Sequence, residues 1–103
     1  MTNKVDLNEL NDSDFLQLIN DKFSPAHAEP AQESFELIEV SRIGSAPQGD
    51  SRHPFSLLFR GSSTESPIQR VYQLEHSKLG QLELFLVPVG PDQTGVLYEA
   101  VFT

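Results

Sequence analysis

Short strand-like segments fill the second two thirds of this chain and constrain its fold more than any other feature. Alternation of apolar and polar residues over a short run is typical of a strand with one buried face. Such runs occur at 34–43, 53–61, 70–76, 81–89 and 96–102. Between them lie residues that favour turns, such as "GSAPQGDSR" at 44–52. The sequence therefore predicts a mainly β (α+β) domain with five or six antiparallel strands.

A short helix is predicted ahead of the strands, at about residues 11–20. Asn11 or Asp12 suits its N-cap, and acidic residues follow in the first turn, where the helix dipole favours them. Apolar side chains then recur at i, i+3 and i+4 as Phe15, Leu18 and Ile19. Residues 22–34 contain two prolines and are predicted to form a loop or a short edge segment.

The length of 103 residues fits one domain with a modest core. We therefore expect a single domain over 1–103, with the helix at about 11–20 and a β body at about 34–103. Within that body the adjacent residues Leu37 and Ile38 break the alternation, which indicates a bulge or a strand buried on both sides.

The last three strands are apolar on both faces. If His76 pairs with Gln81 across a turn at Gly80, one face collects Tyr72, Leu74, Phe85, Val87, Val89, Val96, Tyr98, Ala100 and Phe102. The opposite face then holds Val71, Leu82, Leu84, Leu86, Leu97 and Val101. An open antiparallel sheet usually keeps one face in water. The pattern predicts either closure into a small barrel or sandwich, or a face that contacts another chain.

The same pairing gives Pro88 a position in the sheet. It places Pro88 opposite Gln69 and Leu97, at the start of the preceding strand, where the missing N–H of proline costs no ladder hydrogen bond. The segment "GPDQTG" at 90–95 then reads as a hairpin turn.

Negative charge is concentrated at the start of the chain, whose net charge is −8. Residues 1–39 hold nine acidic residues against two lysines, whereas the remainder holds six acidic and five basic residues. An acidic end repels a phosphate backbone, and no basic stripe with interleaved aromatic residues occurs, so nucleic-acid binding is disfavoured. The charge indicates solubility, with a basic partner surface as the alternative.

Composition also bears on the compartment. Cysteine is absent, which excludes disulfides and thiolate sites. The start, "MTNKVDLNELNDSDF", lacks the apolar core of a signal peptide, and the longest apolar stretch, "LFLVPV", is too short to cross a bilayer. We expect a cytoplasmic protein, or a component of an assembly, without a membrane partner.

No combination of residues matches a catalytic, cofactor or metal site. His27, His53 and His76 are widely separated, and none stands at metal-ligand spacing. The "GPDQTG" segment lacks the Lys-Ser/Thr ending of a phosphate loop, and no Gly-x-Ser-x-Gly motif occurs. The prediction is a protein that is not an enzyme and that uses no cofactor or metal.

Candidate contact residues lie near the strand ends. Arg60 closes an apolar strand and is expected to reach Glu99 or Glu75 as an ion pair at the sheet rim, with a contact to a partner as the alternative. His76, at a hairpin end, is expected to be a solvated cross-strand residue. The candidate interaction residues are Arg60, Glu75, His76, Tyr98 and Glu99.

The second half of the chain carries a family resemblance. "FSLLFRG", then "YQLEHSKLGQLELFLVPVG" and a closing "YEAVF" resemble a family of short bacterial proteins of unassigned function, whose genes often lie beside those of phage tail-collar-type proteins. The match covers residues 53–103, and the first half resembles the family in pattern only. The resemblance implies a non-enzymatic component, adaptor or assembly helper near a tail-like or collar-like assembly.

Two functions follow as expectations. The first is a small interaction protein, accessory or structural, in a phage-tail-like or collar-protein assembly, with a protein partner such as a tail-collar-type protein. The second is a small-ligand-binding module that holds a molecule inside a β-barrel. Self-association into a homo-oligomer is left open by the sequence.

Overall fold

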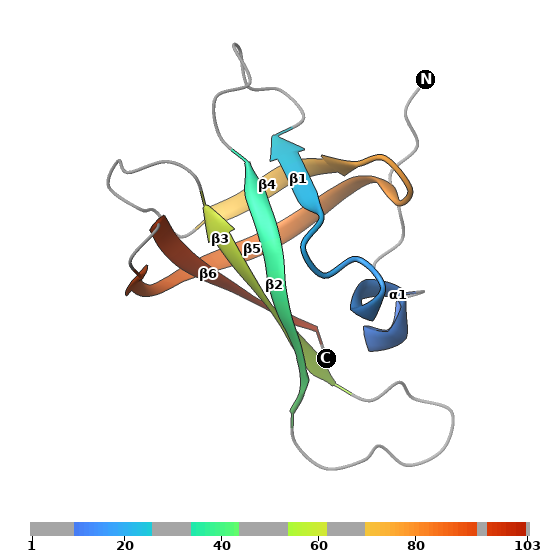
Figure 1. The fold of residues 1–103 in the computed structure, drawn as a ribbon, viewed down its shortest axis with the longest axis horizontal. Helices are drawn as coiled ribbons and strands as arrows, with labels where there is room; N and C mark the ends of the chain where they lie inside the picture. Colours follow the sequence, from blue (N-terminus) through green and yellow to red (C-terminus); the bar gives the residue numbers. More distant parts are fainter. Residues whose placement is uncertain (1–9, 26–33, 44–53, 62–69, 93–94, 103) are drawn as a thin grey trace.

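Six antiparallel strands form a closed barrel in the order β1-β2-β3-β6-β5-β4. The computed structural model describes residues 10–25, 34–43, 54–61, 70–92 and 95–102. The elements are α1 (Asp12–Leu16), β1 (Lys22–Pro25), β2 (Phe35–Arg42), β3 (Phe55–Gly61), β4 (Arg70–His76), β5 (Gly80–Asp92) and β6 (Gly95–Phe102), as Figure 1 shows. The predicted small antiparallel barrel with one short N-terminal helix is confirmed. The turn-rich segment at 44–52 lies outside the described residues.

β1 closes the barrel although it is only four residues long. Lys22 and Phe23 pair with β2, whereas Ser24 and Pro25 pair with β4. The β body therefore begins at β1, ahead of the predicted start at about residue 34. A short segment was one of the two alternatives predicted for residues 22–34, but β1 pairs on both sides and is not an edge. The two prolines and small residues of 22–34 hide the strand in the sequence, because pairing to two neighbours rather than strand propensity fixes it.

A bulge in β2 ties the segment after α1 to the barrel. The register shifts between Leu37 and Glu39, which confirms the bulge predicted from the broken alternation. The Leu37 carbonyl accepts a hydrogen bond from the Asn20 N–H at 2.7 Å, and the Leu37 N–H donates to the Asp21 carbonyl at 3.0 Å. Asn20 has a φ of 79°, a left-handed conformation that asparagine tolerates better than most residues.

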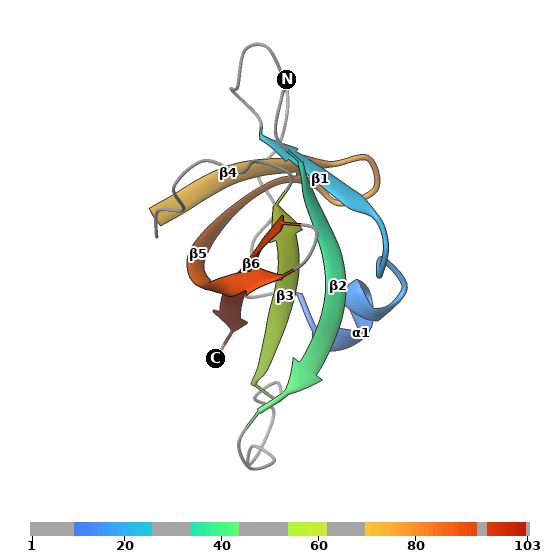
Figure 2. The ribbon, with the colours of Figure 1, turned by 60° about the vertical axis from the view of Figure 1, so that its left-hand side comes forward.

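β5 changes partners along its length, and Figure 2 shows how strongly it curves. Residues 80–86 pair with β4, and the pairing with β6 begins at Val87. Pro88 lies two residues beyond Leu86, the last residue paired with β4, so its missing N–H costs no hydrogen bond to that strand. Its partner on β6 is Tyr98 rather than the predicted Leu97. The tighter turn shifts the register by two residues, and the bulge between Pro88 and Gly90 shifts it back by one.

The hairpin between β5 and β6 is tighter than the six-residue loop predicted over 90–95. Gly90, Pro91 and Asp92 pair with Leu97, Val96 and Gly95, so four residues of the segment 90–95 belong to the ladder. Gly90 has a φ of 136°, which a side chain would strain. The segment is thus a hairpin turn, as predicted, with a shorter connection than the predicted six residues.

The register of β4 and β5 differs by one residue from the predicted one. His76 pairs with Gly80 and Glu75 with Gln81, so the predicted pairing of His76 with Gln81 is wrong. A one-residue slip moves every side chain of a strand to the other face. Leu82, Leu84 and Leu86 consequently lie inside the barrel, together with Tyr72 and Leu74 on β4.

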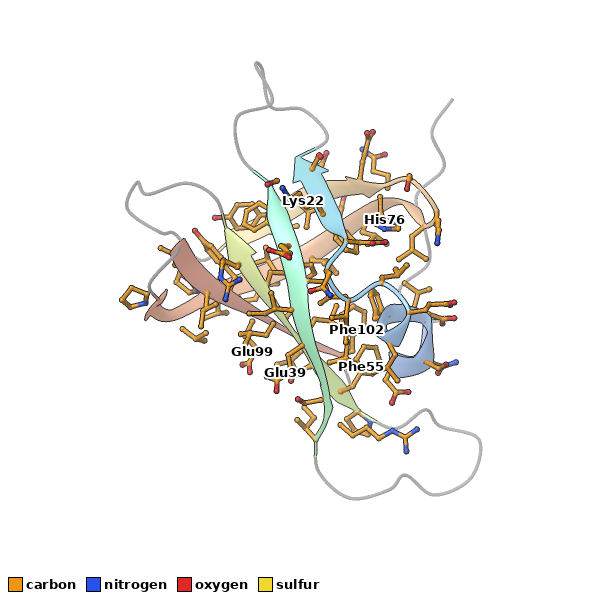
Figure 3. The ribbon with its side chains drawn as sticks, in the orientation of Figure 1. Lys22, Glu39, Phe55, His76, Glu99 and Phe102 are labelled. Carbon is orange, nitrogen blue, oxygen red and sulfur yellow. The ribbon has the colours of Figure 1, made fainter. Side chains whose placement is uncertain are left out.

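Aromatic side chains fill both ends of the barrel. At one end Phe15 of α1 packs against Phe55 and Phe102, with ring centroids 5.9 and 5.5 Å away. Figure 3 shows Phe55 and Phe102 between the strands and α1. At the other end the rings of Phe35, Tyr72 and Tyr98 contact one another edge to face. The helix is therefore a cover for an open barrel end, which explains why so short a helix is stable.

An ion pair holds α1 in place over that end. Arg42, at the end of β2, donates from Nε to Asp12 Oδ2 at 2.6 Å. The hydrogen bond from Arg42 lowers the pKa of Asp12, against the opposing effect of partial burial. Within α1 the Asn11 N–H donates to the Asp14 carboxylate at 2.8 Å, half of a capping box. Two side-chain contacts thus fix the start of the helix.

Candidate functional site

Exposed apolar side chains gather on the outside of β4, β5 and β6. Val71, Phe85 and Val101 are 55, 51 and 54% exposed. Val87, two residues beyond Phe85 on the same face of β5, is half-buried. We call Val71, Phe85, Val87 and Val101 the outer patch. Contiguous apolar patches are uncommon on the surface of monomeric proteins and are often functional.

Strand pairing makes the outer patch continuous. Val71 and Phe85 are direct cross-strand partners. Val87 faces Glu99 on β6, and Val101 stands two residues beyond Glu99, diagonal to Val87. Directly opposed side chains are within contact, and diagonal neighbours lie next to each other on the same face of the sheet. Three strands therefore contribute to a single apolar surface.

Carboxylates surround the outer patch. Glu83 precedes Phe85 by two residues on β5, Glu99 is the cross-strand partner of Val87, and Glu75 lies further along the outer face of β4. We call Glu75, Glu83 and Glu99 the acidic rim. Figure 3 shows Glu99 and Glu39 pointing away from the barrel on the side remote from α1. The rim gives this apolar surface a negative border.

A second surface feature is an open depression of about 420 Å³ over the junction of β1 and β4. Its lining consists of Lys22, Ser24, Glu75, His76, Ser77 and Gly80. His76 is the buried member of this set, and its ring lies 4.7 Å from that of Phe23. The depression therefore places a histidine, two serines and a carboxylate close together, which raises the question of catalysis.

The hydrogen bonds of His76 answer that question. Nδ1 accepts from the N–H groups of Lys78 and Leu79 at 3.0 and 3.3 Å, so the ring proton lies on Nε2. Nε2 then donates to the Asp21 carboxylate at 2.9 Å. Both nitrogens are used in holding the β4–β5 turn to the segment before β1. This geometry leaves neither nitrogen of His76 for proton transfer to a substrate.

Metal ligation and membrane spanning were also considered for the described residues. In that part of the chain no three His, Asp or Glu side chains are grouped to hold a metal ion. Across the same ranges no helix has the length and apolar composition needed to cross a membrane.

Comparison with known proteins assigns the family. A family model described as "Domain of unknown function (DUF6916)" matches residues 10–102, nearly the whole chain. The chain belongs to this family. No curated protein and no solved structure matches it. The DUF6916 domain thus coincides with the barrel and its helix, and its description leaves the function open.

The sequence-predicted contact residues of this DUF6916 domain do not form one site. Arg60 points outward on β3 and lies 3.9 Å from Glu36, its cross-strand partner on β2. The sequence placed its ion-pair partner on Glu99 or Glu75, because the pairing of β2 with β3 was not specified. Glu75 and Glu99 both lie on the outer face, as members of the acidic rim.

Two other candidates are buried in the DUF6916 barrel. Tyr98 is 3% exposed and packs in the interior, so it does not contribute to a surface of the folded domain. His76 is 5% exposed, and the expectation of a solvated histidine is wrong. His76 stands two and four residues after Leu74 and Tyr72, and alternation along β4 puts it on the same inner face. His27 and His53 lie outside the described residues.

Sequence reasoning missed the outer patch because it assigned its members to different faces. Phe85 was grouped with the inner residues, whereas Val71 and Val101 were grouped on the opposite face. The predicted register pairs His76 with Gln81, whereas the observed one pairs His76 with Gly80. Gly80 has a φ of 87°, which favours glycine, so the glycine itself was the available signal for the end of the turn.

Proposed function

We propose that this chain is a non-enzymatic interaction module that binds a protein partner through the outer patch. Its setting would be a phage-tail-like or collar-protein assembly, with a tail-collar-type protein as partner. The observation that carries the proposal is the exposure of Phe85 on the outside of a barrel whose interior is already filled. A half-exposed phenylalanine beside exposed valines gains free energy when a partner removes it from water.

The setting rests on the resemblance of residues 53–103 to proteins encoded beside tail-collar-type genes. That region contains β3 to β6, and thus all of the outer patch. An accessory or structural component needs a recognition surface and no reaction centre. The two serines beside His76 do not contradict this role, since the histidine is engaged in structural hydrogen bonds.

The alternative of a ligand held inside the barrel is less well supported. The rings of Phe23, Phe35, Phe55 and Phe59 on the inner face are fully buried. Barrels that hold a ligand generally have about eight strands or more, because diameter grows with strand number. Six strands enclose less space, and aromatic side chains occupy it.

Co-expression tests the proposal. The chain is produced together with a tail-collar-type protein, and the mixture is separated by size-exclusion chromatography at micromolar concentration. We expect the two proteins to elute together, and Phe85→Ser to elute alone. Leu16→Ser is a matched control, since Leu16 is 50% exposed but lies on α1. Independent elution of the wild type would contradict the proposal.

A further inference from the structure

The charge around the outer patch narrows the class of partner. Outward-facing positions alternate along β4, β5 and β6 with the buried ones. Among the described residues at these outward positions, the charged side chains are the three glutamates of the acidic rim. On the next strand, Leu58 of β3 lies between Glu99 and Glu39. The outward cation of β3, Arg60, lies 3.9 Å from Glu36 on β2, on the side away from β6.

A partner that covers the outer patch also approaches these carboxylates. Removing a carboxylate from water without a counter-charge is unfavourable, so a purely apolar partner is penalised. A lysine or arginine at the rim instead forms a charge-assisted hydrogen bond, and opposite charges accelerate association. The rim therefore selects for cations at the border of the contact.

A second copy of the chain does not satisfy this requirement. Two outer patches facing each other bring two acidic rims together, and like charges across an interface are repulsive. The net charge of −8 adds to that repulsion. Homo-oligomerisation through this face is thus opposed by the same residues that favour a basic partner.

We infer that the outer patch binds an apolar protein segment flanked by lysine or arginine side chains; this rests on the proposed function of the patch. The apolar centre of the segment covers Phe85 and its valine neighbours, and its cations meet Glu75 and Glu99. The apolar part supplies affinity, and the charged part supplies specificity.

Two matched peptides test the inference on the full chain. One alternates valine and threonine between paired lysines at both ends, and the other has glutamates in place of the lysines. Binding is followed by backbone amide NMR shifts. We expect the lysine peptide to shift the amides of Val71, Phe85 and Val101, with binding at least tenfold tighter than for the glutamate peptide. Raising the salt concentration should weaken the binding of the lysine peptide, because salt screens the attraction between its lysines and the glutamates.

Charge-neutral variants provide the decisive comparison. We expect the double variant Glu75→Gln/Glu99→Gln to bind the lysine peptide at least tenfold more weakly while its unfolding midpoint is unchanged. Equal binding of both peptides, absence of shifts at millimolar lysine peptide, or concentration-dependent dimerisation through the same amides would overturn the inference. If the double variant still co-elutes with the tail-collar-type protein but Phe85→Ser does not, the proposed function stands and the inference on charge falls.

Discussion

Leu84 and Phe85 are neighbours on β5, yet they lie on opposite sides of the barrel wall. Leu84 is 2% exposed and packs in the core, whereas Phe85 is 51% exposed beside Val71. Both are large apolar residues, so composition does not distinguish them. The register with β4 decides which one contributes to stability and which one is available to a partner. The inner and outer faces of the same strands therefore have different roles, and substitutions on each face separate them.

The largest effect is expected where α1 closes the barrel. Phe15→Ala removes a fully buried ring that contacts Phe55 and Phe102, and we expect it to lower the free energy of unfolding by about 3–5 kcal/mol. Urea unfolding followed by circular dichroism measures the change. Leu16→Ala is the control, because Leu16 is half exposed, and it should cost less than about 0.5 kcal/mol.

If Phe15→Ala does not fold, Phe15→Leu is measured instead, and we expect a smaller loss in its free energy of unfolding. Equal effects at positions 15 and 16 would show that α1 does not cover the barrel end as described. The inner face would then be less completely closed than the structure indicates.

A smaller effect is expected at the β4–β5 turn. His76→Ala removes the acceptor for the N–H groups of Lys78 and Leu79 and the donor to Asp21. Loss of these partners should lower the free energy of unfolding by about 1–3 kcal/mol. Amide hydrogen exchange at Lys78 and Leu79 should accelerate as well. Lys78→Ala, at an exposed position, serves as the control, and unchanged exchange in His76→Ala would contradict the structural role of the ring.

The smallest effect concerns the ion pair that anchors α1. Asp12→Asn weakens the contact with Arg42, and we expect a loss of about 1 kcal/mol at neutral pH, since Arg42 is largely in water. The double variant Asp12→Asn/Arg42→Gln should lose little more than either single variant. Additive losses would indicate that the two side chains act independently.

The pH dependence of this ion pair has a definite sign. The pKa of Asp12 is lowered in the folded state by the hydrogen bond from Arg42, relative to its ordinary value of 3.8. Its stabilising contribution is therefore fully present above that value and is lost as the pH falls through the lowered pKa. The stability difference between wild type and Asp12→Asn should be constant from about pH 7 to 5 and should shrink below about pH 4.

Local patterns in the sequence were sufficient to predict most of the fold. Alternation in "FSLLFRG" predicts that Phe55, Leu57 and Phe59 share one face, which is the inner one, and the adjacent Leu37 and Ile38 indicated the bulge in β2. Two apolar faces on the last strands left two alternatives, and closure of the sheet is the one that the structure has. These features depend on neighbours in the chain, which a single sequence displays.

The features that the sequence did not give depend on pairing between distant segments. β1 is identified by its partners on β2 and β4 rather than by its own residues. The ion pair of Arg60 with Glu36 requires β2 beside β3, and the outer patch requires Gly80 opposite His76. Register is weakly specified when both faces of a strand are apolar. The exposed apolar residues that make up the outer patch therefore also prevented the sequence from showing which face they lie on.

The free energies of unfolding of Leu84→Ala and Phe85→Ala, measured side by side in urea, decide which side chain faces the core. We expect a loss of about 2–5 kcal/mol for Leu84→Ala, because it leaves a cavity in the core. We expect a change within about 0.5 kcal/mol for Phe85→Ala, whose ring lies on the surface. The reverse order would place Phe85 in the core and contradict both the register of β5 and the outer patch built on it.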